Sequence, residues 1–80
     1  MYGDTKQKYV RIYPYNLIVI FPQGIKHEKF KSLNPISAGF CHIYDNKVSC
    51  YGESVTLELK SMPDDSEIAT RQLFGIVEEE

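Results

Sequence analysis

The stretch SAGFCHIYDNKVSCYGES, from Ser37 to Ser54, decides the fold because it nearly mirrors itself about Asp45-Asn46. Asp and Asn tolerate the left-handed backbone conformations that short hairpin turns require. Positions equally far from that centre carry the same or similar residues, namely Gly39 and Gly52, Phe40 and Tyr51, and Cys41 and Cys50. We therefore predict a β-hairpin in which like residues face each other across two antiparallel strands.

The mirror register also sorts the side chains of this hairpin by face, because neighbouring residues of a strand point to opposite sides. One side gathers an apolar set typical of a core: Cys41, Ile43, Val48 and Cys50. The opposite side gathers Phe40, His42, Tyr44, Lys47, Ser49 and Tyr51. A slip of one residue would place Cys41 opposite Tyr51 and mix the two sets, so the pattern favours the mirror register.

The aromatic side of the hairpin is the candidate binding surface, and its residues are Phe40, His42, Tyr44, Lys47 and Tyr51. Some small domains stack single-stranded bases on aromatic side chains of a sheet and hold the phosphates with lysines. Aromatic rings of this kind also pack against a covering helix, a second copy of the chain or another protein. All of these alternatives fit the sequence.

Cys41 and Cys50 are the only two cysteines of the chain. The mirror register makes them a non-hydrogen-bonded pair with Cα atoms about 4.5 Å apart, which is at the short end of the disulfide range. We expect reduced thiols buried in the core, with a dithiol switch as an alternative. His42 points to the other face, so these residues do not predict a metal site, and no cofactor is expected.

Two segments near the N-terminus predict a second hairpin. Residues 9–13 alternate with a period of two, which places Tyr9 and Arg11 on the side away from the core. Residues 14–16, Pro-Tyr-Asn, have the composition of a turn. Residues 17–21, LIVIF, are apolar on both faces and predict a strand at the centre of the sheet.

A fifth strand is expected at residues 54–60, SVTLELK, because this segment alternates most regularly. The alternation directs Val55, Leu57 and Leu59 to one face and polar side chains to the other, as in a half-buried strand.

Two helices are predicted. Residues 25–33 form a short one, whose apolar stripe is Ile25, Phe30 and Leu33. Residues 63–74 form a longer one that ends at Gly75, with Asp64 and Glu67 at the spacing of a capping box. Its apolar stripe is Ile68, Ala69, Leu73 and Ile76.

These elements predict an α+β fold that occupies residues 1–80 as a single domain, with residues 1–7 and 78–80 frayed. The expected architecture is a two-layer sandwich: a mostly antiparallel sheet of four or five strands with both helices on one face. The order along the chain is β-β-α-β-β-β-α.

Composition and charge limit the function. The chain has 80 residues, of which 42% are hydrophobic and 25% charged, as in ordinary globular proteins. Its longest apolar run is far too short to span a bilayer and its start does not resemble a signal peptide, so we expect a cytoplasmic protein that does not insert in membranes. The first 47 residues are net basic and the remainder net acidic.

No motif of an enzyme appears, because the five glycines are scattered singly and the acids near residue 64 are explained by helix capping. We therefore expect a small non-catalytic protein-interaction or regulatory module, which binds a protein partner or forms a homodimer. The alternative is a single-stranded nucleic-acid-binding domain that uses the aromatic side of the hairpin, although the net charge of −2 disfavours it. A second alternative is a dithiol switch at Cys41 and Cys50.

Overall fold

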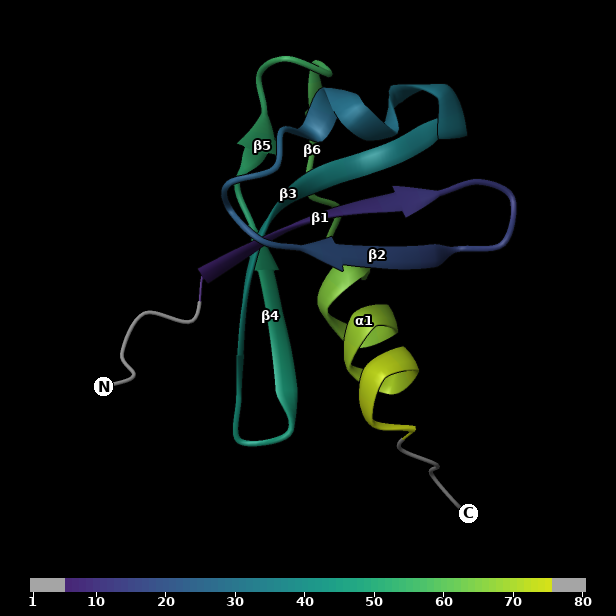
Figure 1. The fold of residues 1–80 in the computed structure, drawn as a ribbon. Helices are drawn as coiled ribbons and strands as arrows, with labels where there is room; N and C mark the ends of the chain where they lie inside the picture. Colours follow the sequence, from purple (N-terminus) through teal and green to yellow (C-terminus); the bar gives the residue numbers. More distant parts are fainter. Residues whose placement is uncertain (1–5, 76–80) are drawn as a thin grey trace.

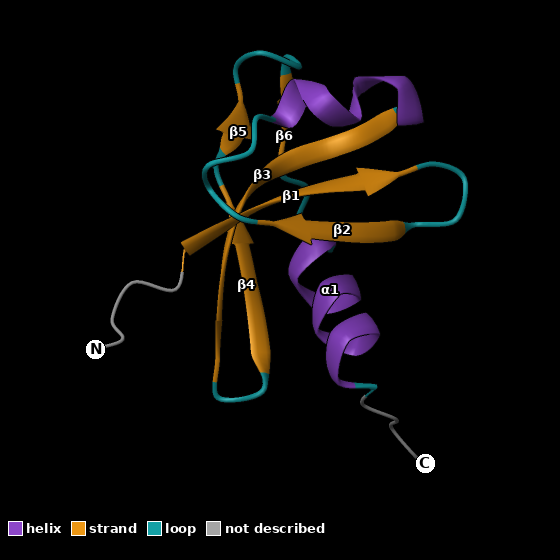
Figure 2. Ribbon diagram, viewed as in Figure 1, coloured by secondary structure: helices purple, strands orange, loops and turns teal. Residues whose placement is uncertain are grey.

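The computed structural model describes residues 6–75, and it contains an antiparallel sheet of four strands, a second small sheet and two helices (Figures 1 and 2). The elements follow each other along the chain as β1 (Lys6–Ile12), β2 (Leu17–Phe21), the 3-10 helix η1 (His27–Leu33), β3 (Pro35–Tyr44), β4 (Lys47–Tyr51), β5 (Glu53–Ser54), β6 (Leu59–Lys60) and α1 (Asp65–Phe74). The α+β prediction is therefore confirmed at this level.

The large sheet has the strand order β2-β1-β3-β4, and every neighbouring pair is antiparallel. Strand β2 is thus at an edge, so the prediction that residues 17–21 lie at the centre of the sheet is wrong. The register between β3 and β4 is the mirror register: Cys41 lies opposite Cys50 and Phe40 opposite Tyr51. Asp45 and Asn46 both have positive φ, as a tight turn requires. The N-terminal hairpin also forms, with β1 and β2 joined through residues 13–16. Residues 6 and 7 belong to β1, so the frayed N-terminal segment was predicted too long. The predicted fraying at residues 78–80 falls outside the described residues.

The two helices lie on opposite faces of the sheet, so the prediction of both helices on one face is wrong. Ala69 of α1 packs with Tyr9 and Cys41, whereas Phe30 of η1 packs with Val10 and Ala38. Tyr9 and Val10 are neighbours in β1, so they point to opposite faces. Both are fully buried. The alternation in β1 was therefore misjudged, because its polar-looking side is as buried as its apolar side.

The predicted strand at residues 54–60 is also wrong, because the chain reverses direction within it. Ser54 and Leu59 pair with each other at the base of a tight hairpin between β5 and β6. The Ser54 hydroxyl accepts a hydrogen bond from the Leu57 amide at 3.3 Å, and Glu58 takes a positive φ. Leu57 and Leu59 still reach the core on the η1 side, but Val55 is left exposed. Two-residue alternation is thus compatible with a turn as well as with a strand.

A buried polar network fixes the start of α1 against β1. Asp65 is fully buried, and it accepts hydrogen bonds from the Tyr9 hydroxyl, from Arg11 Nη1 at 2.9 Å and from the Met62 amide at 2.8 Å. Asp64 is the N-cap residue, but its side chain makes no capping bond and pairs with Arg11 at 2.9 Å instead. The predicted capping box is therefore wrong in its contacts.

This network shifts the pKa values of Tyr9, Arg11 and Asp64. Burial, followed by the hydrogen bond to Asp65, raises the pKa of Tyr9 far above its ordinary range. Burial works to lower the pKa of Arg11, but its bonds to Asp65 and Asp64 outweigh that effect and raise it. The bond from Arg11 lowers the pKa of Asp64. Each group is thereby held in its ordinary charge state at neutral pH.

Helix α1 also satisfies the outer edge of β4. The Val48 amide donates to Thr70 Oγ1 at 2.8 Å, and the Thr70 hydroxyl donates to the Val48 carbonyl at 3.2 Å. The Cys50 amide donates in the same way to Ser66 Oγ at 2.7 Å. Four residues of a helix rise about 6 Å and two residues of a strand about 6.7 Å, so the two spacings match along the contact. Two hydroxyls thus take the place of a neighbouring strand.

The other edge of the sheet is bonded by the same helix. The side-chain amide of Gln72 accepts from the Ile18 amide at 2.9 Å and donates to the Ile18 carbonyl at 2.6 Å. One helix therefore contacts both β2 and β4, which is possible because the sheet curves around it. Edge strands with unpaired backbone groups are prone to pair with other chains, and these side chains cover part of both edges.

We predict that Thr70→Val destabilises the protein by about 1–2 kcal/mol, because valine keeps the shape of threonine but leaves the Val48 amide and carbonyl without their partner. Chemical denaturation of both proteins measures the free energy of unfolding. The matched control is Thr56→Val in the exposed turn between β5 and β6, which we expect to change stability by less than about 0.5 kcal/mol. Equal losses in both variants would contradict the proposed role of Thr70.

Candidate binding surface

The predicted binding residues come together on one face of the β3–β4 hairpin. Phe40 lies opposite Tyr51, and Tyr44 lies opposite Lys47. His42, two residues from Phe40 along β3, shares their face. We call this set, Phe40, His42, Tyr44, Lys47 and Tyr51, the aromatic face. It is the face of the sheet opposite α1, and its tyrosines are solvent-exposed: 60% for Tyr44 near the tip of the hairpin and 37% for Tyr51 at the far end of β4.

The rings of the aromatic face form a row. His42 and Tyr51 are stacked, with centroids 5.4 Å apart and planes 13° apart, and their Nε2 and hydroxyl groups are hydrogen-bonded at 3.0 Å. Tyr51 is followed by Phe40 at a centroid distance of 6.2 Å. The contacts rigidify the side chains of two neighbouring strands, so the surface is preorganised at its centre.

The same row continues into the interior, where the sequence analysis had not placed it. His27 of η1 contacts the Phe40 ring edge-on at 5.8 Å and the Phe21 ring at 5.5 Å. The ring of Phe30 follows at 4.4 Å from Phe21. The exposed rings are therefore the outer end of an aromatic row that starts in the core under η1.

His27 is the buried residue of η1, whereas Ile25 and Leu33 of the predicted stripe are exposed. Its Nε2 donates a hydrogen bond to the Gly39 carbonyl at 2.9 Å. Burial, assisted by the charge of nearby Lys8, lowers the pKa of His27. A histidine in a lysine-rich segment carries no local signal of burial, since its partners come from β2 and β3.

Gly39 is required where β3 passes the end of β4. A side chain at this position would start 2.4 Å from the Tyr51 carbonyl oxygen, which is closer than a Cβ atom is found in proteins. Gly52, the mirror partner of Gly39 in the sequence, takes a φ of +80° and turns the chain from β4 into β5. The symmetric glycines therefore have different structural roles, one steric and one conformational.

Lysines border the aromatic face. Lys6 Nζ lies 4.5 Å from the centroid of the Phe40 ring, and Lys8 lies opposite Phe40 in the register of β1 and β3. Lys8 also donates to the Ile25 carbonyl at 2.9 Å. A frayed N-terminal segment, as the sequence predicts, would not bring Lys6 to this face, whereas β1 does.

The two cysteines face each other as predicted and are free thiols. Cys41 is fully buried and Cys50 partly so. Burial raises the pKa of Cys41 to about 11. Burial, then the proximity of Cys41 and Asp65, raises the pKa of Cys50 to about 12. The geometry brings the two sulfurs together, but the environment disfavours the thiolate that oxidation requires.

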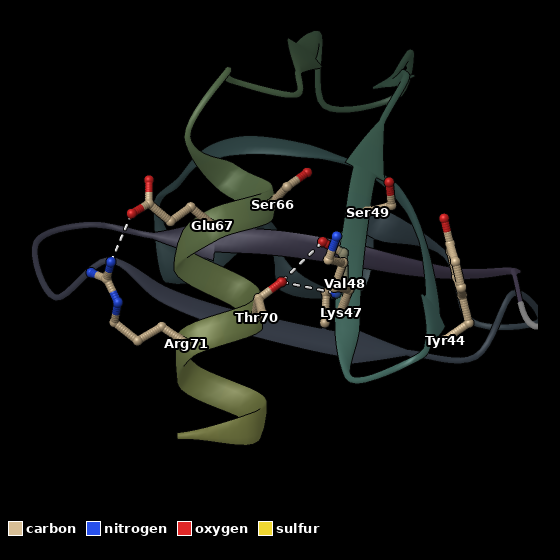
Figure 3. Close-up of a pocket in the computed structure, with 8 residues that line it drawn as sticks. All are labelled: Tyr44, Lys47, Val48, Ser49, Ser66, Glu67, Thr70 and Arg71. Carbon is tan, nitrogen blue, oxygen red and sulfur yellow. Dashed lines mark hydrogen bonds and ion pairs between the residues drawn. The ribbon is translucent and has the colours of Figure 1, made fainter. Parts of the chain in front are cut away.

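A groove of about 380 Å³ runs between α1 and the outer edge of β4 (Figure 3). Its lining includes the Thr70 hydroxyl, which is bonded to β4, and the ion pair between Arg71 and Glu67 at 2.7 Å. Tyr44 and Lys47 reach it from the tip of the hairpin. The polar side chains at its centre thus already have partners within the protein.

Within residues 6–75, no three His, Cys, Asp or Glu side chains are grouped so that they could hold a metal ion. Among the described elements, neither helix is long and apolar enough to cross a membrane.

We predict that native Cys41 and Cys50 react at least about 100-fold more slowly with an alkylating reagent at neutral pH than the same thiols in the unfolded chain. The reason is that raising a thiol pKa from 9.0 to about 11 lowers its thiolate fraction by about two powers of ten. Mass spectrometry of native and denatured samples over time measures both rates. Equal rates, or rapid disulfide formation by a mild oxidant, would instead support the dithiol switch.

We also predict that the free energy of unfolding falls as the pH drops through 6.5, the ordinary pKa of histidine. The unfolded chain binds a proton at His27 before the native state does, so stability present above this pH is lost below it. Each unit by which the pKa is lowered removes about 1.4 kcal/mol. Denaturation at several pH values should show this slope in the wild type but not in His27→Gln. The same slope in both proteins would contradict the prediction.

Comparison of the chain with models of protein families, with curated proteins and with solved structures gives no match.

Proposed function

We propose that this protein is a small non-catalytic interaction module, which acts by binding a macromolecular partner through the aromatic face. The observation that carries the proposal is the row of Phe40, Tyr51 and His42, whose rings are fixed by mutual contacts while their outer end remains exposed. Rigid aromatic side chains with polar tips lose little entropy on binding and are enriched at interfaces.

The remaining features support a binding role more than a chemical one. The buried acids and Arg11 pair with each other and hold α1 in place. The buried thiols are disfavoured as nucleophiles by their raised pKa values. The aromatic face, with its exposed tyrosines, is therefore the surface to which we assign binding.

A protein partner, including a second copy of this chain in a homodimer, is the partner class that the sequence favours. A protein surface would cover the exposed parts of Tyr44 and Tyr51 and leave the hydrogen bond between Tyr51 and His42 intact. A regulatory role would follow from such binding, because a chain of this size has little room for a second site.

We predict that the double variant Tyr44→Ser/Tyr51→Ser, used as bait in affinity capture, loses the partners that the wild type retains, with a decrease of about tenfold or more. The matched control is Tyr13→Ser/Tyr15→Ser, which removes two other exposed tyrosines from the turn between β1 and β2. Proteins are identified by mass spectrometry, nucleic acids by sequencing and self-association by sedimentation. If both double variants retain the same partners as the wild type, or if the wild type retains none, the aromatic face is not the binding site.

A further inference from the structure

The aromatic face has cations on both of its margins. Lys6 and Lys8 extend from β1 on one side of the ring row, and Lys47 extends from β4 on the other side. Lys6 already lies over the Phe40 ring. Rings are therefore at the centre of this surface and positive charges at its borders.

The charges of residues 6–75 are divided in the same way. All seven lysines lie on strands of this face, on η1 or its N-cap Lys26, or on the β5–β6 hairpin, and η1 and this hairpin cover the inner half of the face. Four acids lie among them: Glu28, Asp45, Glu53 and Glu58. One of these acids, Glu53, is opposite Lys60 in the β5–β6 register. On the α1 side, Asp64 and Asp65 pair with Arg11, and Glu67 pairs with Arg71. Among residues 6–75, the side with the aromatic face is therefore locally basic, although the whole chain has a net charge of −2.

A partner that complements this surface needs planar groups for the rings and negative charges for the lysines. Single-stranded nucleic acid supplies both in alternation, because its bases are available to aromatic side chains while its phosphates follow the strand. A duplex conceals its bases in the stack, and an acidic peptide supplies the charges without the planar groups. Charge complementarity and ring chemistry together favour the single strand.

We propose that the aromatic face binds single-stranded nucleic acid, with bases against Tyr44, His42 and Tyr51 and phosphates at Lys6, Lys8 and Lys47. This inference rests on the proposed function and names the partner class for the same site. The net charge disfavours nucleic acid as a partner, and this inference reverses that preference. The reason is that the sequence alone does not show where the lysines lie on the folded protein.

The experiment is a titration of the full chain into fluorescently labelled oligo(dT) and oligo(U), followed by anisotropy at increasing salt concentration. Three lysines that neutralise three phosphates give a slope of log K against log salt of about −2 on a single strand. The affinity should therefore fall by about 20-fold between about 50 and 200 mM salt.

Three variants identify the site. Lys6→Gln/Lys47→Gln should reduce the slope to about −0.7, because Lys8 alone remains. Tyr44→Leu keeps an apolar side chain but removes the ring, and it should weaken binding by about tenfold at constant slope. The matched control is Lys31→Gln on η1, at the far end of β3 from the hairpin, which should leave affinity and slope unchanged. Thermal unfolding verifies that each variant is folded.

Several outcomes would overturn the inference. They are a lack of binding at the lowest salt, an equal loss in Lys31→Gln, and equal competition by duplex DNA. Competition by polyglutamate as effective as by the oligonucleotide would point to an acidic protein partner instead. If the oligonucleotides do not bind while affinity capture yields a protein that Tyr44→Ser/Tyr51→Ser loses, the inference fails and the proposed function stands.

Discussion

The fold depends on the contact between Arg11 of β1 and Asp65 at the start of α1. Both side chains are buried, and Tyr9 and the Met62 amide donate to the same carboxylate. A buried ion pair adds little net stability, but loss of one partner leaves an uncompensated charge in the interior and costs several kcal/mol. The network therefore selects one position of α1 more than it strengthens the protein, since a shifted helix would leave the carboxylate or the guanidinium without partners.

The position of α1 determines which backbone groups on the two edge strands of the sheet are hydrogen-bonded. From its anchored first turn, the helix directs Ser66 and Thr70 to the edge of β4 and Gln72 to the edge of β2. These bonds require only that the helix lie at a fixed distance from both strands, which the first turn sets. A four-stranded sheet of this length would otherwise expose backbone donors and acceptors along two edges. The charge pair in the core and the closure of the edges are thus parts of one arrangement.

Contacts between residues that are close in the chain can be predicted from the sequence, but contacts between residues far apart in the chain cannot. The β3–β4 register could be read from the mirrored residues because a hairpin pairs positions that are close in the chain. Asp64 looked like a capping residue because its partner Arg11 is 53 positions away, a contact that no local pattern encodes. His27 was missed for the same reason, since its neighbours belong to β2 and β3. The strand expected at residues 54–60 does not form because the Leu57 amide donates a hydrogen bond to the Ser54 hydroxyl and closes a turn within the alternating segment.

The candidate site, too, could be predicted from the sequence only where its residues are close in the chain. The residues of the aromatic face were found from the hairpin alone, whereas Lys6 and Lys8 joined them only when β1 was placed beside β3. Because α1 is committed to the opposite face and to the two edges, it cannot cover these rings. On this side η1 and the β5–β6 hairpin reach the inner half, where Phe30, Leu57 and Leu59 pack. The exposure of the outer rings is therefore a consequence of where the helix is held, and a binding surface arises where the protein has no described element left to cover it.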